Sequence, residues 1–271
     1  MAVKIGLALG GGGARGLAHV GVIEAMRAAG VPIHCIAGTS IGAIVGAAVA
    51  AGRMEQIRIW AREPDWRKLP RLFFETRLTT KALMRGDRIA SFLRELIPAA
   101  TFADLPMPFA AVATDLATGE RVVMTEGDLL SAVRASMSIP GVFAPVERDG
   151  RTLVDGGLVD PVPVAACRAL GAERVMAIDL NGPECAATGK RPGRINLMDV
   201  LLGAFHIVNA ELTRRTLAVD EPDVLLQPPV GDVMMLDFRH AERLIDVGRS
   251  LFEERRGEVL QKLGLASGRT I

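Results

Sequence analysis

The sequence predicts an α/β domain in which helices cover a mostly parallel β-sheet. Its N-terminal part, residues 3–51, alternates two apolar, strand-like segments with two helix-like segments, an order typical of parallel sheets. The 271 residues are 49% hydrophobic and 23% charged, a composition that can bury a substantial core. Neither an internal repeat nor a clear linker divides the chain, and we therefore expect a single domain over residues 1–271.

Glycines separate the first four predicted elements. We expect a strand at 3–9, a helix at 17–29, a second strand at 31–37 and a helix at 43–51. Gly30 stands directly after the first helix, where glycine commonly ends a helix. The helix at 43–51 consists mainly of Ala, Val, Ile and Gly, and we expect it to be buried because it offers no polar face.

Residues 55–103 differ from the segments around them. They are richly charged, carry Trp60 and Trp66, and show helical spacing over 88–97. We expect helices and loops that lie over the sheet as a helical cap. The aromatic side chains either face a core, as is usual for aromatics at helical spacing, or contact a lipid.

The remaining elements are shorter and are separated by turn residues. Asp149-Gly150 is a strong β-hairpin signal, and Pro161 with Pro163 opens a helix that Gly171 ends. The polar stretch 186–194 predicts a loop. The predicted elements are strands at 109–114 and 121–125, a helix at 129–136, hairpin strands at 142–148 and 151–154, a helix at 164–170, a strand at 174–180, a long helix at 197–219, a short strand at 223–227 and a closing helix at 241–263.

Charge and cysteine usage exclude several classes of function. With 32 basic and 31 acidic residues the net charge is +1, so no overall field attracts nucleic acid and we expect no nucleic-acid partner. Cys35, Cys167 and Cys185 are odd in number and lack metal-ligand spacing, which favours neither a metal site nor disulfides. We expect a protein without metal or cofactor, in a reducing compartment.

No targeting or membrane-spanning segment stands out. The apolar start at 1–9 lacks the cationic region and cleavage site of a signal peptide, and it predicts a strand instead. The most apolar stretch, 36–51, is interrupted by glycines and polar residues and is too short to cross a membrane. We therefore expect a soluble, cytoplasmic protein.

The segment Gly38-Thr39-Ser40-Ile41-Gly42 reads G-x-S-x-G and lies between a predicted strand and a predicted helix. On such a turn a serine projects its hydroxyl outward, and the glycines two residues either side keep side chains away from the bend. Ser40 is therefore a candidate nucleophile. The alternative is an ordinary strand–helix turn in which Ser40 caps the helix, a position that serine favours.

A run of glycines separates the first predicted strand from the first helix. Gly11 to Gly16 satisfies G-x-G-x-x-G, the dinucleotide-binding fingerprint. That site also needs an acidic residue near the end of the second strand, and no carboxylate occurs there. Backbone amides at a helix N-terminus suit any anion, including the oxyanion formed when a serine attacks an ester. Arg15 either adds charge to this loop, braces it, or pairs with a carboxylate at the surface.

A nucleophilic serine needs a base. None of the four histidines occupies an obvious catalytic loop: His19 and His206 fall in predicted helices, His34 in a predicted strand, and His240 near the start of the last helix. Only His240, near the start of the last helix, stays a candidate for a Ser-His-Asp triad. Asp155 follows a predicted strand and precedes Gly156-Gly157, so its carboxylate would stand on a tight turn at a strand end. An Asx-type turn produces the same pattern.

Three motifs in this order make the chain resemble the bacterial patatin-like phospholipases. They are the glycine loop GGGARG (Gly11 to Gly16), the elbow GTSIG (Gly38 to Gly42) and the turn DGG (Asp155 to Gly157). The segments 135–140 and 236–238 are also similar to members of that family. The catalytic motifs lie within about residues 3–180.

The resemblance implies a three-layer α/β/α sandwich with a mostly parallel central sheet. It implies a Ser-Asp dyad, with Ser40 as the nucleophile and Asp155 as the proton acceptor. It also implies an oxyanion hole formed by the backbone amides of Gly11, Gly12 and Gly13, with Arg15 as a further candidate. Other glycines of the three motifs would support these turns: Gly16, Gly38, Gly42, Gly156 and Gly157.

The family's substrates are acyl esters of lipids, commonly phospholipids or lysophospholipids, and their cleavage requires no cofactor. Transient contact with a membrane surface is compatible with such substrates. Two alternatives stay open. One is a lipid-binding regulatory protein with the same fold and little turnover, and the other is a dinucleotide-binding oxidoreductase, which the missing acidic residue disfavours.

Overall fold

The central sheet is the frame of the molecule, which a computed structural model describes over residues 3–62, 87–182 and 197–265. The sheet has eight strands in the order β5-β6-β3-β2-β1-β7-β8, with β4 pairing β3 outside this path. The parallel pairings join five strands: β1 (Ile5–Leu9), β2 (Cys35–Thr39), β3 (Phe109–Asp115), β7 (Arg174–Ile178) and β8 (Val224–Leu226). β3 is parallel to β2 and antiparallel to β4 and β6. The antiparallel pairings involve β4 (Arg121–Met124), β5 (Val146–Arg148) and β6 (Arg151–Asp155). The predicted mostly parallel sheet is confirmed.

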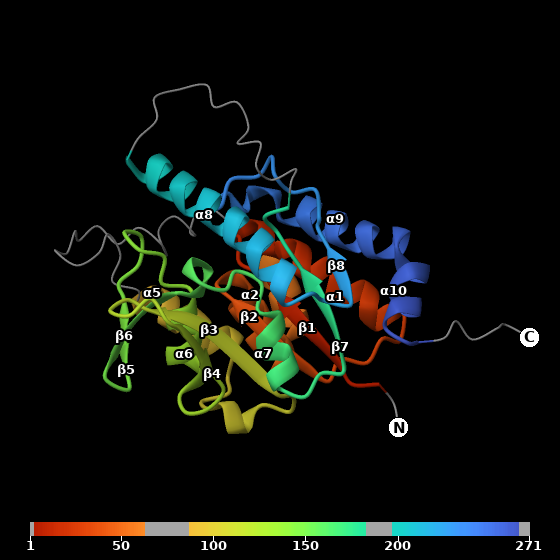
Figure 1. Ribbon diagram of the computed structural model, residues 1–271, viewed down its shortest axis with the longest axis horizontal. Helices are drawn as coiled ribbons and strands as arrows, with labels where there is room; N and C mark the ends of the chain where they lie inside the picture. The colour runs from red at the N-terminus through yellow and green to blue at the C-terminus, as the bar shows by residue number, and fades with distance from the viewer. Residues whose placement is uncertain (1–2, 63–86, 183–196, 266–271) are drawn as a thin grey trace, which may run out of the picture.

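Helices cover both faces of this sheet, which gives the expected three layers (Figure 1). On one face lie α1 (Leu17–Ala28) and α2 (Ile41–Ala50), with α9 (Ala241–Glu254) packed on α1. The other face is covered by α7 (Val164–Ala169) and α8 (Leu197–Val219). The three-layer α/β/α sandwich is therefore confirmed.

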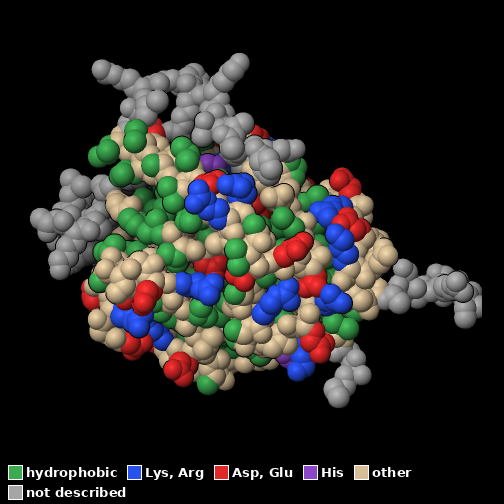
Figure 2. Space-filling view, in the orientation of Figure 1, with side chains coloured by type: hydrophobic (Ala, Val, Ile, Leu, Met, Phe, Trp, Pro, Cys, Tyr) green, Lys and Arg blue, Asp and Glu red, His purple; other side chains and the backbone are tan. Residues whose placement is uncertain are grey.

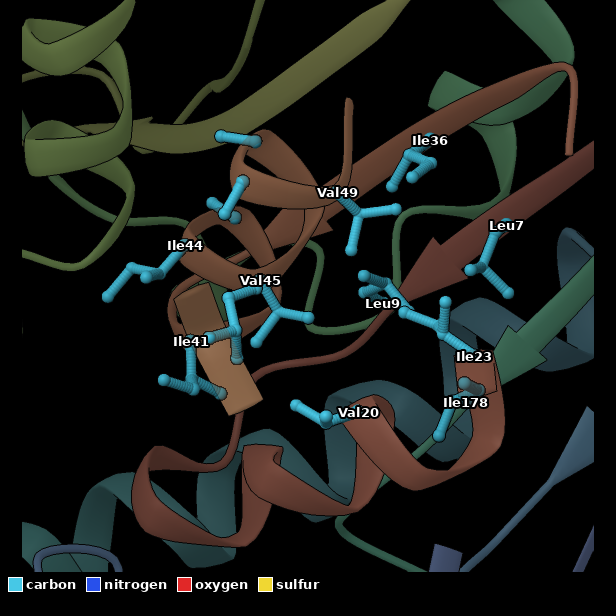
Figure 3. Packing of buried hydrophobic residues seen from close by; sticks show 14 of the residues in the cluster. Leu7, Leu9, Val20, Ile23, Ile36, Ile41, Ile44, Val45, Val49 and Ile178 are labelled. Carbon is cyan, nitrogen blue, oxygen red and sulfur yellow. The ribbon is translucent and has the colours of Figure 1, made fainter. Parts of the chain in front are cut away.

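Strand residues divide between the two layers because successive side chains point to opposite faces. Leu7 and Leu9 of β1 pack with Val20 and Ile23 of α1 in the larger core (Figure 3). Ala8, between them, lies in the smaller core beneath α7. This alternation holds the carboxyl ends of β1 and β2 side by side, with Leu9 opposite Gly38 in register.

The other described elements are shorter. They are the helices α3 (Met54–Arg62), α5 (Asp87–Leu96), α6 (Leu129–Ser136) and α10 (Arg256–Lys262), and the 3₁₀ turns Gly13–Gly16, Phe102–Asp104, Gly156–Leu158 and Phe238–His240. Within the described ranges, no helix combines the length and the apolar character needed to cross a membrane.

Part of the predicted cap and the predicted loop at 186–194 lie outside the described residues. Of the cap, α3 and α5 are described, whereas Trp66 is not. Trp60 of α3 contacts Phe92 of α5, with ring centroids 5.1 Å apart, and Phe238 at 6.0 Å. These aromatics pack against one another, as expected of side chains that face a core.

Three predicted boundaries were wrong. The second strand begins at Cys35 rather than at residue 31, because the Val31 amide donates to Met26 at the end of α1 (3.0 Å). The strand predicted at 142–148 covers only Val146–Arg148, because residues 139–143 form a turn closed on the Ile139 carbonyl. The closing helix is two helices, since Arg255 leaves helical geometry and its guanidinium donates to the Leu225 carbonyl (2.7 Å).

Candidate active site

Ser40 occupies a sharp elbow between β2 and α2. Its backbone has φ 57° and ψ −123°, a conformation that residues with a side chain rarely adopt. A Cβ on Gly38 would overlap the Gly42 backbone, and one on Gly42 would overlap the Leu9 carbonyl, so only glycine fits at either position. The Ser40 side chain makes no cap bond to α2, which leaves the capping alternative unsupported.

The Ser40 hydroxyl donates to Asp155 instead. The distance from Ser40 Oγ to Asp155 Oδ2 is 2.6 Å, and the exposed fractions are 5% for Ser40 and 0% for Asp155. The second carboxylate oxygen, Oδ1, accepts the Gly157 amide at 2.8 Å. Asp155 therefore forms the Asx-type turn that the sequence allowed and still presents one oxygen to Ser40.

Burial raises the pKa of Asp155 from 3.8 to about 7, although hydrogen bonds from Ser40 and Gly157 oppose this shift. A carboxyl group with a pKa near 7 is a stronger base than an ordinary aspartate, and it is still ionised in part at neutral pH. The low solvent access that makes Asp155 basic thus suits it to accept a proton from the Ser40 hydroxyl.

The backbone around the pair is held by side chains from other elements. Ser136 Oγ, at the end of α6, accepts the Ser40 amide (3.0 Å) and donates to the Val112 carbonyl (2.6 Å). The Asp155 amide donates to the Ser138 carbonyl at 2.9 Å, and Thr114 Oγ1 donates to the Asp155 carbonyl at 2.8 Å. β3 and α6 thereby fix the elbow and the Asp155 turn relative to one another.

The raised pKa of Asp155 has a consequence for stability. Between about pH 4 and 7 the native state keeps a proton on Asp155 that the unfolded chain has released. The contribution of Asp155 to the free energy of unfolding is therefore complete below pH 3.8 and is lost as the pH rises to about 7. Asp155→Asn, neutral at every pH, escapes this loss. We expect its free energy of unfolding, relative to wild type, to rise by up to about 3 kcal/mol between pH 5 and pH 8.

Urea unfolding of both proteins at the two pH values measures this difference. Asp149→Asn is the matched control, because Asp149 is exposed on the β5–β6 hairpin and its positive φ of 51° suits asparagine. A stability difference between Asp155→Asn and wild type that stays constant from pH 5 to pH 8 would contradict the raised pKa.

The glycine loop lies beside the elbow. A Cβ on Gly11 would stand 3.4 Å from Ser40 Cβ, and one on Gly16 would overlap Ile41. The Gly11 amide donates to the Pro161 carbonyl at 3.0 Å, so this amide is already engaged. Gly13 has φ 61° and packs so closely on the Met235 carbonyl that no side chain fits there.

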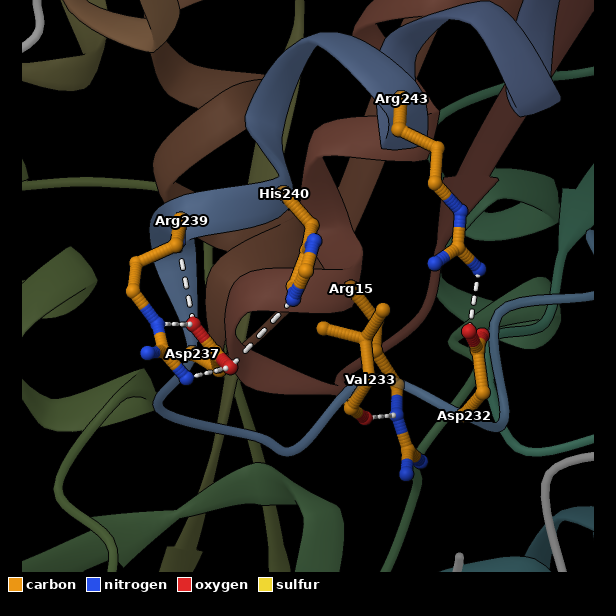
Figure 4. Close-up of polar contacts among 7 residues, drawn as sticks. All are labelled: Arg15, Asp232, Val233, Asp237, Arg239, His240 and Arg243. Atoms are coloured by element: carbon orange, nitrogen blue, oxygen red, sulfur yellow. Dashed lines mark hydrogen bonds and ion pairs between the residues drawn. The ribbon is translucent and has the colours of Figure 1, made fainter.

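Arg15 is buried, with an exposed fraction of 4%, and the interpretation as a surface arginine was wrong. Its Nε donates to the Val233 carbonyl at 2.7 Å (Figure 4), and another guanidinium nitrogen lies 3.3 Å from His206 Nδ1 of α8. The Ala14 amide donates to Met235 at 2.7 Å. Arg15 therefore braces the glycine loop against the segment before α9.

Residues 7–168, which include all three motifs and both members of the Ser40–Asp155 pair, match the family model described as patatin-like phospholipase. The chain belongs to the patatin-like phospholipase family.

Several relatives share this domain. An uncharacterized NTE family protein of Mycobacterium tuberculosis is 44% identical over 181 residues, 67% of this chain and 50% of that protein. Patatin-like phospholipase domain-containing protein 7 of Rattus norvegicus is 37% identical over 181 residues, 65% of this chain and 13% of that protein. This patatin-like chain thus spans half or less of the length of these relatives.

The crystal structure of VipD from Legionella pneumophila has the same fold, with a TM-score of 0.63 at 14% identity over 97% of this chain and 67% of VipD.

Three of the histidines of this patatin-like domain make contacts away from the Ser40 hydroxyl. His19 is fully buried beneath the glycine loop, its Nε2 lies 2.8 Å from the Gly10 carbonyl, and burial lowers its pKa to about 4. His206 contacts Arg15, and His240 lies beside Asp237 at 3.6 Å (Figure 4). The Ser40 hydroxyl donates to the Asp155 carboxylate rather than to an imidazole, so this contact gives the Ser-His-Asp triad no support.

Residues that the motifs do not include complete the patatin-like site. Ser136 belongs to the segment 135–140 that is similar to the family, but nothing in the sequence indicates its contact with the Ser40 amide. Asn181 Nδ2 donates to the Gly11 carbonyl at 3.3 Å, and Asn209 of α8 lies against Gly157. A Cβ on Gly156 would overlap the Val112 carbonyl, which explains the first glycine of the Asp155 turn.

The cysteines and acidic residues show no sign of another centre in the described part of the chain. Cys35 and Cys167 are free, buried thiols, and Cys185 lies outside the described residues. Over the same described ranges, no group of three or more His, Cys, Asp or Glu side chains is arranged to hold a metal ion.

Proposed function

We propose that this patatin-like protein is a serine lipid acyl hydrolase that cleaves carboxylic esters of phospholipids or lysophospholipids. The observation that carries the proposal is the 2.6 Å hydrogen bond from Ser40 Oγ to the buried Asp155 carboxylate, at a strained elbow, in a chain of this family. A cytoplasmic location, with peripheral contact at a membrane, stays a prediction from the sequence.

Asp155 acts first as a base. It accepts the Ser40 proton while Ser40 Oγ attacks the ester carbonyl, and the tetrahedral intermediate collapses to an acyl-enzyme. The leaving alcohol takes the proton back from Asp155. Water then attacks the acyl-enzyme as Asp155 accepts a proton from it, and collapse releases the fatty acid and restores the Ser40 hydroxyl.

The glycine loop would stabilise the oxyanion. We assign this role to the backbone amides of Gly12 and Gly13, because the Gly11 amide already donates to Pro161. Gly11 instead permits close approach of the loop to Ser40, and Arg15 braces the loop from behind. Loss of one donor of this type typically lowers the rate by about 10²–10³-fold.

A panel of lipids tests this assignment. Phosphatidylcholine, lysophosphatidylcholine, triacylglycerol and a short-chain ester are each incubated with wild type and with Ser40→Ala, and fatty acid release is measured. We expect release from at least one phospholipid or lysophospholipid by wild type alone. Equal release by both proteins, or none from any ester by folded wild type, would contradict the proposal.

The dinucleotide alternative finds no support in the geometry. The Ala14 amide, in the 3₁₀ turn before α1, donates to the Met235 carbonyl, which also lies against Gly13, so this amide is already engaged and is not available to a pyrophosphate. We expect neither NAD nor NADP to raise the melting temperature of the protein.

Ser136 is expected to position the nucleophile. Ser136→Ala removes the acceptor of the buried Ser40 amide, and an unsatisfied buried donor costs about 1–3 kcal/mol. If the lost hydrogen bond misaligns Ser40 and raises the activation barrier by this amount, kcat should decrease roughly 10- to 100-fold with little change in KM. Steady-state kinetics on a soluble ester measure both constants.

Ser131→Ala, which removes a hydroxyl from the other end of α6, is the matched control for this substitution. A merely structural role for Ser136 would lower the melting temperature without changing kcat. That result would contradict the positioning role.

A further inference from the structure

Helix α8 is apolar on two opposite sides, although it lies at the surface of the molecule (Figure 1). Its inner side packs on the domain through Leu202 and Phe205, followed by the buried His206 and Asn209. Its outer side carries residues that recur at helical spacing and are exposed to solvent. We call these residues the outer stripe: Leu197, Val200, Leu201, Ala204, Ile207 and Val208.

The outer stripe is unusual because its aliphatic side chains are both large and open to water. The exposed fractions are 74% for Leu197, 54% for Val200 and 66% for Ile207. Hydrophobic side chains gather at the upper left of Figure 2, over the N-terminal half of α8. A contiguous apolar patch of this kind on a soluble domain marks an interaction surface.

The helix that carries the stripe contacts both halves of the candidate active site. His206 lies 3.3 Å from the guanidinium of Arg15, which braces the glycine loop. Asn209 lies against Gly157 in the Asp155 turn. Leu201, within the stripe itself, packs on Gly141, where a Cβ would stand 3.3 Å from its Cδ1. The outer stripe lies on the opposite side of α8 from His206 and Asn209, so whatever covers it is separated from the Ser40–Asp155 pair by about the 10–12 Å thickness of a helix.

The charges along α8 favour a lipid surface as the occupant. Between residues 197 and 210 the only charged residue is Asp199. The next turns carry Glu211 with Arg214 and Arg215, which both pair with Glu211 and are 72% and 70% exposed. The three residues together carry a net positive charge, and an apolar ridge followed by such a charge matches the acyl and phosphate layers of a membrane interface.

A second copy of the chain fits this surface less well. A stable protein–protein interface buries about 800 Å² on each partner and involves about 20–30 residues a side. The outer stripe offers six residues on one convex helix. We propose that the outer stripe is the docking surface for a lipid–water interface, which it would bring within about one helix diameter of the candidate active site, an inference that rests on the proposed function only for the identity of the lipid as substrate.

Vesicle partition tests docking without hydrolysis. Both proteins carry Ser40→Ala, so that the lipid is not hydrolysed. The double variant Val200→Asn/Ile207→Asn is compared with its Ser40→Ala parent for binding to phosphatidylcholine vesicles. Since a buried aliphatic side chain contributes about tenfold to partition, we expect at least about tenfold weaker binding. Val219→Asn is the matched control, because Val219 is 83% exposed on the same helix but lies about 18 Å beyond Ile207. The control should bind within about twofold of its parent.

The same substitutions in the Ser40 protein separate the two proposals. Hydrolysis of a water-soluble short-chain ester should be unchanged, whereas hydrolysis of vesicle lipid should fall in parallel with partition. Unchanged partition in the double variant would overturn the docking surface and leave the proposed function intact. Stripe-dependent vesicle binding by a wild type that cleaves no ester would support docking and overturn the proposed function. Sedimentation that shows a wild-type dimer, lost in the double variant, without vesicle binding, would also overturn the docking surface.

Discussion

Ser40→Ala is expected to lower ester hydrolysis by at least about 10³-fold, because the proposed acyl-enzyme forms on the Ser40 hydroxyl. The substitution leaves the elbow intact, since alanine has the same backbone restriction as serine and the Ser136 contact uses the amide of residue 40. Fatty acid release, measured beside the circular dichroism spectrum and melting temperature, tests whether activity is lost from a folded protein.

Ser131→Ala serves as the control for loss of a hydroxyl and should retain the wild-type rate. Residual turnover in a clean Ser40→Ala preparation at more than about one hundredth of the wild-type rate would mean that another residue attacks the ester.

Asp155 should impose a pH dependence on the wild-type rate. Because the base must be ionised, kcat/KM should fall as the pH decreases through about 7, the value to which burial raises the pKa of Asp155, and should reach a plateau above it. Asp155→Asn should be about 10²–10⁴-fold slower than wild type on the plateau above pH 7 and should lack this limb. Rates on a soluble ester from pH 5 to pH 9 provide the measurement.

Asp149→Asn, on the exposed tip of the same hairpin, should keep both the rate and the pH profile. A wild-type profile that is flat between pH 6 and pH 8, or a normal rate in Asp155→Asn, would exclude Asp155 as the base. The melting temperature of Asp155→Asn, measured at each pH beside the rates, separates loss of the base from unfolding of the variant.

The fold and the two turns that carry Ser40 and Asp155 could be predicted because both depend on local patterns. Alternation of apolar segments with glycine turns specifies a parallel sheet, and an elbow or a tight turn at a strand end requires glycine within a few residues of Ser40 or Asp155. Errors arose where contacts distant in sequence decide the outcome. Arg255, for example, ends α9 because its guanidinium reaches the Leu225 carbonyl on β8.

The surroundings of the pair could not be predicted for the same reason. Ser136 lies 96 positions from Ser40 in sequence, and its role depends on how α6 packs beside β3. Arg15 is charged, and its burial against the Val233 carbonyl follows from the course of a loop more than 200 residues later. The raised pKa of Asp155 likewise depends on complete burial, which no local pattern reports.

Covalent labelling tests the dyad most directly. Wild type, Ser40→Ala and Asp155→Asn are treated with a fluorophosphonate probe, and the adduct is located by peptide mass spectrometry. We expect one adduct, on Ser40 of wild type, that forms more slowly as the pH falls below about 7, and no adduct on either variant. An adduct on another residue, or a folded wild type that never reacts, would contradict a nucleophilic Ser40 activated by Asp155.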